Sequence, residues 1–282
     1  MPRTSIANVT ETALWVAALR AQETGRSDAA LQDPLASLLA GNRGVEIARS
    51  MPNSVLTQWG VVVRTSAIDR LIEEAIRRGI QTVVNLGAGL DTRPYRMQIS
   101  PHIHWIEIDF PNIVHLKDTV LNAQTPSCRL ERIGLNLLDR AARRKILAAY
   151  GSRDALAIAE GVIPYFSNDD VAVLADDLRA AAFEYWMLDF DNAGNRRTPR
   201  NWAKQLQAAP FLFQPNDWFG FFASRGWGAH RIITSSEESE RLNRPYPLSF
   251  PKGLVMHALP REVRQRILAV SGAALLATKK LA

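Results

Sequence analysis

One segment of the chain, residues 83–93, constrains the fold more than any other. It reads VVNLGAGLDTR, so an apolar run typical of a buried strand leads directly into Gly87-Ala88-Gly89. Two glycines without side chains let the backbone turn sharply and approach a ligand closely. A turn of this kind at the end of a strand is typical of an open α/β sheet with a nucleotide-type cofactor against the loop. By itself the Gly-x-Gly pattern also fits an ordinary tight turn.

The next predicted strand supports the cofactor interpretation because it ends in acid about twenty residues later. Glu107 and Asp109 lie two residues apart, so both side chains point to the same side of that strand. An acid there accepts hydrogen bonds from the ribose hydroxyls of a cofactor. We select Asp109 because it is nearer the carboxyl end, and the alternative is that it caps the helix beginning at Pro111. Thr92 replaces the third glycine of a dinucleotide fingerprint, which favours a nucleoside cofactor without a pyrophosphate.

Short strand-like runs alternate with helical patterns through the middle of the chain, as expected for parallel strands joined by crossover helices. The predicted strands cover residues 82–86, 104–109, 129–135, 155–159 and 184–189, followed by two later runs at 228–234 and 253–259. Together these runs predict an α/β fold with a doubly wound, seven-stranded, mostly parallel sheet and a terminal antiparallel pair.

Four zones are predicted within a single domain that spans the whole chain. They are a helical cap over residues 1–80, a cofactor-binding core over 81–190, a helical substrate-side insertion after the fifth strand over 191–226, and terminal strands with a C-terminal helix over 227–282. The C-terminal helix is expected from about Pro260 to Lys280. Its apolar pattern suits either a cover over the pocket or packing against a second subunit, which leaves a homodimer open.

Composition and charge restrict the compartment and the partners. Cys128 is the single cysteine, which excludes an intramolecular disulfide and a cysteine-rich zinc site and fits a reducing compartment. The sequence predicts no metal site. The chain contains neither a spanning apolar run nor the apolar stretch of a signal peptide, so we expect a cytoplasmic protein with no membrane partner. The net charge of +6 is compatible with an anionic small substrate. Because basic residues occur in scattered groups without interleaved aromatics, the pattern argues against nucleic acid as a partner.

A second acid follows another apolar strand. Residues 155–159 run into Glu160 and Gly161 at the strand's carboxyl end, which places Glu160 in the same cleft as the glycine turn. A carboxylate among apolar residues needs a cationic partner, and the amino group and sulfonium of S-adenosylmethionine would supply one. The alternative is a solvent-exposed loop acid.

With these residues in view, the chain resembles the leucine carboxyl methyltransferase-like family of S-adenosylmethionine-dependent O-methyltransferases, which includes polyketide carboxyl methyltransferases. The motifs that carry the resemblance span most of the chain and are Arg20-Ala21-Gln22-Glu23-Thr24, Asp33-Pro34, Arg64-Thr65, the Gly87-Ala88-Gly89 turn with Asp91-Thr92-Arg93, Glu107-Ile108-Asp109, and Glu160-Gly161 with Tyr165. The resemblance implies a Rossmann-like methyltransferase fold with S-adenosyl-L-methionine as the cofactor.

The resemblance also implies which residues bind that cofactor. Arg64 would hold its carboxylate, and a planar guanidinium suits this role because it matches a carboxylate bidentately. The turn from Gly87 through Ala88 to Gly89 would line the methionine end, Asp109 would take the ribose, and Glu160 would lie by the amino group.

One position departs from the family pattern. Asn136-Leu137 stands where the family usually has an Asp-Leu pair beside the adenine. Asparagine keeps an acceptor and adds donors but loses the charge. The alternative is that Asp139 takes this role.

The expected reaction is an in-line attack of a substrate oxygen on the sulfonium methyl. A carboxylate is already ionised at neutral pH and needs no general base, and none of the five histidines sits in a recognisable base motif, which favours a small carboxylic acid over a hydroxyl acceptor. Tyr165 and Arg20 are the candidates for orienting the acceptor. The aromatic residues of the insertion indicate either an apolar or aromatic acid as the substrate or, equally, a satellite core. They are Phe211, Phe213, Trp218, Phe219, Phe221 and Phe222.

Two other classes of function compete with this interpretation. A non-catalytic S-adenosylmethionine-binding protein is compatible with the change at Asn136. A nicotinamide-dependent oxidoreductase shares the strand, glycine turn and acid pattern, but the chain lacks the third glycine and a Tyr-x-x-x-Lys motif.

Overall fold

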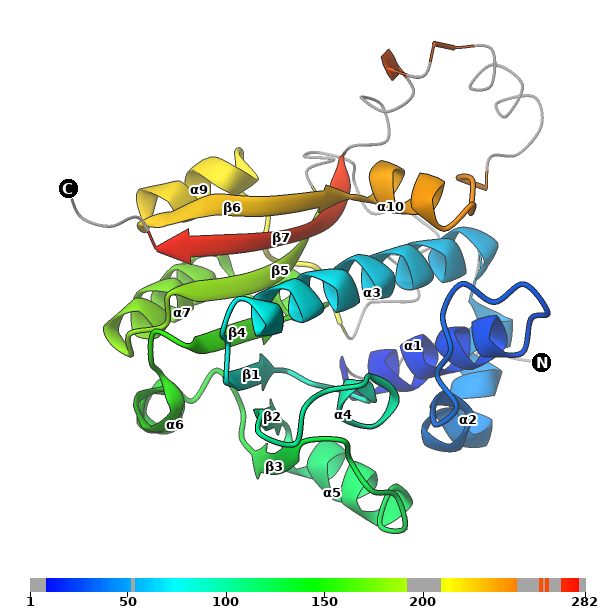
Figure 1. The fold of residues 1–282 in the computed structure, drawn as a ribbon, viewed down its shortest axis with the longest axis horizontal. Helices are drawn as coiled ribbons and strands as arrows, with labels where there is room; N and C mark the ends of the chain where they lie inside the picture. The colour runs from blue at the N-terminus through cyan, green and yellow to red at the C-terminus, as the bar shows by residue number, and fades with distance from the viewer. Residues whose placement is uncertain are drawn as a thin grey trace.

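A computed structural model describes residues 9–51, 54–191, 209–247, 259–260, 262–263 and 270–278. Within these residues a seven-stranded sheet has the order β3-β2-β1-β4-β5-β7-β6 (Figure 1). Its strands are β1 Thr82–Leu86, β2 His104–Asp109, β3 Arg129–Gly134, β4 Ala155–Ala159, β5 Tyr185–Asp191, β6 Trp227–Thr234 and β7 Ser271–Thr278. Strands β1 to β5 pair in parallel, and β7 runs antiparallel to both of its neighbours. The predicted doubly wound, mostly parallel sheet is confirmed.

Helices cover both faces of this sheet. Their bounds are α1 Val9–Thr24, α2 Ala36–Ser50, α3 Ser54–Arg77, α4 Arg93–Arg96, α5 Pro111–Val120, α6 Arg140–Tyr150, α7 Asn168–Ala180, α9 Trp218–Ser224 and α10 Ser235–Arg241, with a 3₁₀ turn η1 at Ile163–Tyr165. Local signals explain several starts: Pro111 opens α5, Asp139 caps α6, and Ser167 caps α7 in a capping box. Among the described residues, no helix is both long and apolar enough to cross a membrane.

Alternation along the strands divides the core into two layers. Val83 faces Ile68 and Leu71 of α3, whereas its neighbour Val84 belongs to the layer that packs against α6, α7 and α9. Figure 1 shows α3 lying across the sheet on one side, with α6 and α7 on the other. Because strands buried on both faces need apolar residues at every position, β4 reads as an uninterrupted small apolar run, ALAIA.

Helices α1 and α2 pack at the carboxyl edge of the sheet, within the zone where a helical cap is predicted, and we call these two helices the cap. A third apolar cluster joins Trp15 and Leu19 of α1 and Ile47 of α2 to Leu90, the residue after the glycine turn. At Gly44 the backbones of α1 and α2 come so close that a Cβ atom would lie 2.6 Å from the Leu14 carbonyl oxygen. The cap therefore packs directly on the loop that follows β1.

One prediction at the C-terminus is wrong. A helix was expected from about Pro260 to Lys280, but residues Ser271–Thr278 form β7, an inner strand between β5 and β6. The run from Ala273 to Leu276 is buried on both faces of the sheet, and periodicity cannot separate such a run from a buried helix. The strand predicted at 253–259 lies almost entirely outside the described residues. The zone boundaries stay predictions.

Candidate functional site

A cavity of about 1,410 Å³ lies at the carboxyl ends of β1, β2, β4 and β5, between the cap and the segment before α9. Strand order reverses between β1 and β4, and open α/β sheets bind ligands at such a switch point. Every residue predicted for the site lines this cavity: Arg20, Arg64, Gly87, Ala88, Gly89, Asp109, Asn136, Leu137, Glu160 and Tyr165. The tertiary structure thus brings all of them to one place.

The turn after β1 requires its glycines. Gly87 and Gly89 have φ angles of 66° and 49°, in the left-handed region that side chains disfavour. A Cβ atom on Gly87 would also lie 2.3 Å from Cγ2 of Val162, a residue of the turn after β4. The Gly87 amide donates to the Ile108 carbonyl of β2 at 2.7 Å, which ties the turn to the neighbouring strand. The β1 turn therefore packs against the β4 turn with no space for a side chain.

The two acids of β2 have different surroundings. Asp109 lies in the cavity, where its Oδ2 accepts from the Gly89 amide at 2.6 Å and its Oδ1 from the Phe110 amide at 2.7 Å. Burial raises the pKa of Asp109 despite these bonds. Glu107 is 1% exposed and lies between Lys117 Nζ at 2.7 Å and Arg132 Nε at 2.8 Å, away from the cavity. This geometry favours Asp109 over Glu107 as the ligand-facing acid.

The alternative role of Asp109 as the cap of the helix at Pro111 is wrong. Phe110 is the N-cap of α5, and that cap has no side-chain hydrogen bond. Asp109 bonds to the amide of the next residue and to the Gly89 amide across the turn. Its carboxylate therefore braces the glycine turn and still faces the cavity.

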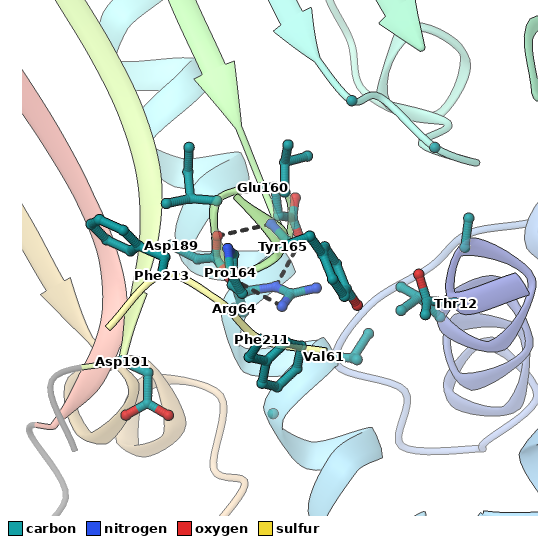
Figure 2. Close-up of a pocket in the computed structure, with 18 of the residues that line it drawn as sticks. Thr12, Val61, Arg64, Glu160, Pro164, Tyr165, Asp189, Asp191, Phe211 and Phe213 are labelled. Carbon is teal, nitrogen blue, oxygen red and sulfur yellow. Dashed lines mark hydrogen bonds and ion pairs between the residues drawn. The ribbon is translucent and has the colours of Figure 1, made fainter. Parts of the chain in front are cut away.

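Arg64 of α3 reaches the end of β4 and β5 (Figure 2). Its Nε donates to Glu160 Oε1 at 3.0 Å, and its Nη1 donates to Asp189 Oδ2 at 3.2 Å. The Arg64 side chain is 25% exposed and both acids are 14% exposed. Glu160 is therefore a largely covered, paired acid, and the alternative of a solvent-exposed loop acid is wrong.

The cationic partners of Glu160 belong to the protein itself, whereas the sequence predicts that the cofactor supplies them. Its Oε2 lies 2.8 Å from Nη2 of Arg93, which is 2% exposed. Burial raises the pKa of Glu160, but the charges of Arg93 and Arg64 outweigh burial and hold that pKa below its usual range. Glu160 is thus ionised and bridges two arginines.

Arg93 is the central residue that sequence reasoning missed. Its guanidinium contacts Asp69 Oδ1 at 2.6 Å and Asp91 Oδ2 at 3.0 Å in addition to Glu160. Burial opposes the ionised form of Asp91, yet Arg93, Lys117 and Arg96 together lower its pKa far below the usual range. The available signal was the Asp-Thr-Arg sequence after the glycine turn, which was read as a family mark without a role. We call the linked set the charged network: Arg64, Asp69, Asp91, Arg93, Arg96, Glu160 and Asp189.

Asn136 lies in the cavity at the end of β3, and its Oδ1 accepts from the Leu138 amide at 3.0 Å. Leu137 is 6% exposed and packs in the core beneath it. Asp139, the alternative residue, caps α6 through the Ala142 amide at 3.1 Å and does not line the cavity. The structure therefore places the Asn-Leu pair, and not Asp139, at the site.

The two residues predicted to orient the acceptor differ in their surroundings. Tyr165 packs edge-on against Phe211 at 5.4 Å between ring centroids, and Figure 2 shows its hydroxyl directed towards Thr12 of α1. Burial raises the Tyr165 pKa, against the Thr12 hydrogen bond and the Arg64 charge. Arg20 is bound by Asp33 at 2.8 Å and by the Leu90 carbonyl at 2.6 Å, so it fastens α1 to the glycine turn. A role for Arg20 towards the acceptor stays a prediction.

The aromatic residues of the insertion divide into two groups, one in the cavity wall and one in the core, and their role towards a substrate stays a prediction. Phe211, Phe213 and Trp218 line the cavity. Phe219, Phe221 and Phe222 do not; Phe222 is fully buried and packs on Trp186 at 5.2 Å. Sequence reasoning missed two further wall residues, Trp59 of α3 and Tyr246 after α10, whose ring centroids lie 4.8 Å apart. They join the cavity wall through contacts that are distant in sequence.

Known proteins similar to this chain show its family. Residues 13–179 match the leucine carboxyl methyltransferase family, more than half of the chain. The chain belongs to this family. A Streptomyces avermitilis relative named "Putative S-adenosyl-L-methionine-dependent methyltransferase" is 32% identical over 260 residues, which cover 86% of this chain and 91% of the relative.

Solved structures agree with the fold of this leucine carboxyl methyltransferase family member. A DUF574 family protein from Streptomyces avermitilis has a TM-score of 0.55 at 17% identity, covering 93% of this chain and 97% of its own. A crystal structure titled as a putative methyltransferase from Thermobifida fusca has a TM-score of 0.54 at 15% identity, covering 93% and 94%. At these identities the likeness shows a shared Rossmann-like fold.

Proposed function

We propose that this S-adenosyl-L-methionine-dependent methyltransferase transfers the methyl group to a carboxylate oxygen of a small apolar or aromatic acid. The observation that carries the proposal is a single cavity with two unlike walls. The charged network and the glycine turn form one wall, and aromatic residues of the cap and of the segment before α9 form the other. A polar, zwitterionic cofactor suits the first wall and an apolar acceptor suits the second.

The residues present fit the cofactor. Nη2, Nη1 and Cζ of Arg64 would lie 3.7, 3.8 and 3.9 Å from a Cβ atom on Gly161, so the guanidinium lies against this glycine. Its contacts to Glu160 and Asp189 use Nε and Nη1, which would leave Nη2 for the cofactor carboxylate. Glu160 would receive the amino group, Asp109 the ribose hydroxyls, and the amide of Asn136 the adenine. When bound, S-adenosylmethionine supplies an electrophilic methyl group on a sulfonium.

The acceptor wall supports a carboxylate nucleophile. None of the described residues that line the cavity is a histidine, and a carboxylate needs no base because it is ionised at neutral pH. Phe211 and Phe213 would bury the apolar body of the acid, and the Tyr165 hydroxyl would orient its carboxylate. Holding the oxygen in line contributes several kcal/mol through orientation alone, about 7 kcal/mol or more in well-ordered cases.

The first test measures ligand binding. Titration calorimetry of the purified full chain with S-adenosylmethionine, S-adenosylhomocysteine and NAD should give micromolar binding of the first two and none of NAD. A screen of aromatic and aliphatic carboxylic acids, read by mass spectrometry for a 14 Da gain and by ester hydrolysis in base, then tests the acceptor class. Methylation of alcohols or phenols alone would contradict the carboxylate proposal. Cofactor binding with no methylation across acids, phenols and alcohols would favour the non-catalytic alternative.

A further inference from the structure

Asp189 carries a further inference because no sequence pattern selected it and yet it touches two separate parts of the site. It lies near the carboxyl end of β5, with its side chain 14% exposed. One carboxylate oxygen accepts from Arg64 Nη1 at 3.2 Å, and the other accepts from the Gly161 amide at 2.8 Å (Figure 2). We propose that Asp189 is a positioning residue that aligns Arg64 and the Glu160-Gly161 turn for the cofactor carboxylate. This inference rests on the proposed function.

The first argument concerns the orientation of Arg64. An arginine side chain has many rotamers, and fixing one of them during ligand binding costs conformational entropy. Glu160 holds the guanidinium at Nε and Asp189 holds it at Nη1, so two contacts define its plane before a ligand arrives. These contacts use Nε and Nη1, which leaves Nη2 for the ligand carboxylate on a guanidinium that lies against Gly161. Asp189 thus lowers the cost of ordering Arg64 on binding.

The second argument concerns the turn after β4. Gly161 has a φ angle of 66°, and its amide is held by Asp189. The residue before it, Glu160, binds Arg64 and Arg93, and the residue after it, Val162, packs on Gly87. One carboxylate therefore connects α3, the β4 turn and, through Val162, the glycine turn after β1.

The third argument concerns the pKa of Asp189. Burial raises its pKa even though Arg64 opposes that shift. An acid whose pKa stays raised although an arginine faces it is typical of functional sites. A structural ion pair should show the opposite pattern, in which the partner holds the acid's pKa low.

Asp189→Asn tests this inference because an amide offers one acceptor and one donor where the structure uses two acceptors. If the amide oxygen of the new side chain still accepts the hydrogen bond from the Gly161 amide, the NH₂ group of that side chain faces Nη1 of Arg64. Both groups are hydrogen-bond donors, so the contact with Arg64 is lost. The probes are S-adenosylhomocysteine and 5′-methylthioadenosine, which share the adenosine and the thioether but differ in the amino-acid part. We expect about a tenfold loss of affinity for the first, about 1.4 kcal/mol, and no change for the second.

The matched control is Asp177→Asn. Asp177 is also a buried acid paired with an arginine, Arg143 at 2.5 Å, but it lies in α7 and does not line the cavity. This variant should leave the affinity for both probes unchanged and lower the melting temperature more than Asp189→Asn does. Adding Asp189→Asn to an Arg64→Gln background should change S-adenosylhomocysteine affinity less than twofold.

Three results would overturn the inference. They are unchanged S-adenosylhomocysteine affinity in Asp189→Asn, an equal loss for both probes, and a full tenfold loss that persists in the Arg64→Gln background. Failure of the wild-type chain to bind S-adenosylhomocysteine would instead overturn the proposed function, and this inference with it. If Asp189→Asn does not fold, Asp189→Glu, which keeps the charge but moves it outwards by one methylene, replaces it with the same expected pattern.

Discussion

The two walls of the cavity use different physical interactions. On the cofactor wall, the charged network joins three arginines to four acids, with contacts such as Arg93 to Asp69 at 2.6 Å. On the opposite wall, aromatic rings such as Phe211 and Tyr165 meet edge-on at 5.4 Å. Charge-assisted hydrogen bonds depend on distance and direction, whereas apolar contacts depend mainly on buried area. A wall of the first kind suits one ligand of fixed shape, and a wall of the second kind tolerates variation.

This contrast predicts that changes on the cofactor wall alter folding and cofactor affinity, and that changes on the acceptor wall alter acceptor kinetics. The largest effect is expected at the centre of the charged network.

Arg93→Ala should lower the free energy of unfolding by about 3 kcal/mol, because it removes a buried cation shared by three partly buried acids. Urea unfolding followed by circular dichroism measures this change. The control is Arg225→Ala, since Arg225 pairs with Asp176 on the surface and such pairs contribute less than about 1 kcal/mol. Similar losses in both variants would remove the distinction between the network and an ordinary surface ion pair.

Asp109→Ala should weaken S-adenosylhomocysteine binding by about 2 kcal/mol, roughly thirtyfold, through loss of charged acceptors for the ribose. Calorimetry measures the affinity. A melting curve measures how far the variant is destabilised by loss of the hydrogen bond from the Gly89 amide to Asp109. Asp176→Ala, an exposed acid outside the cavity, serves as the control. Unchanged affinity in Asp109→Ala would exclude its ribose role.

Phe211→Ala should raise the acceptor KM about tenfold, about 1.4 kcal/mol, and leave S-adenosylhomocysteine affinity unchanged. Its ring lines the cavity beside Tyr165 and takes no part in the charged network. Leu212→Ala, at the adjacent exposed position, should alter neither quantity. A fall in cofactor affinity in Phe211→Ala would show that the two walls are not independent.

The smallest effect is expected on mild acidification. The pKa values of Asp91 and Glu160 lie below their ordinary values of 3.8 and 4.5, so their stabilisation is complete above those values and is lost as the pH falls through the lowered pKa values. Their share of the unfolding free energy should therefore change by less than about 0.5 kcal/mol between pH 7 and pH 5, and fall progressively below pH 4.5. Urea unfolding across this range measures it, with Phe211→Ala expected to follow the wild-type profile. A steep loss between pH 7 and pH 5 would contradict the assignment.

The fold and the site differ in how far sequence predicts them. Strands β1 to β6 follow their predicted ranges closely, because an alternation of apolar runs with turn residues is a local property. The strand β7 was missed because Ser271–Thr278 is apolar on both faces, and its identity depends on its neighbours β5 and β6. The ligand-facing residues were predictable because they follow strand ends in an open sheet.

The partners of those residues were not predictable in the same way. Glu160 was expected to need a cation, but the sequence offered no reason to choose Arg64 and Arg93. Arg64 and Asp189 are separated by 125 positions in the chain and meet only when α3 lies across β5. No spacing rule along a strand or helix reports such a contact.

From the sequence alone follow the strand-turn-helix order, the sharp glycine turn at Gly87 and the edge of the sheet where ligands are expected. These depend on backbone preferences and on alternation over a few residues, so they can be read locally. The packed structure was needed to show which charges pair, that Glu107 turns to Lys117 and Arg132, and which aromatic rings line the cavity. The reason is physical: burial and charge pairing are properties of neighbours in space, and the packed fold brings those neighbours together from distant parts of the chain.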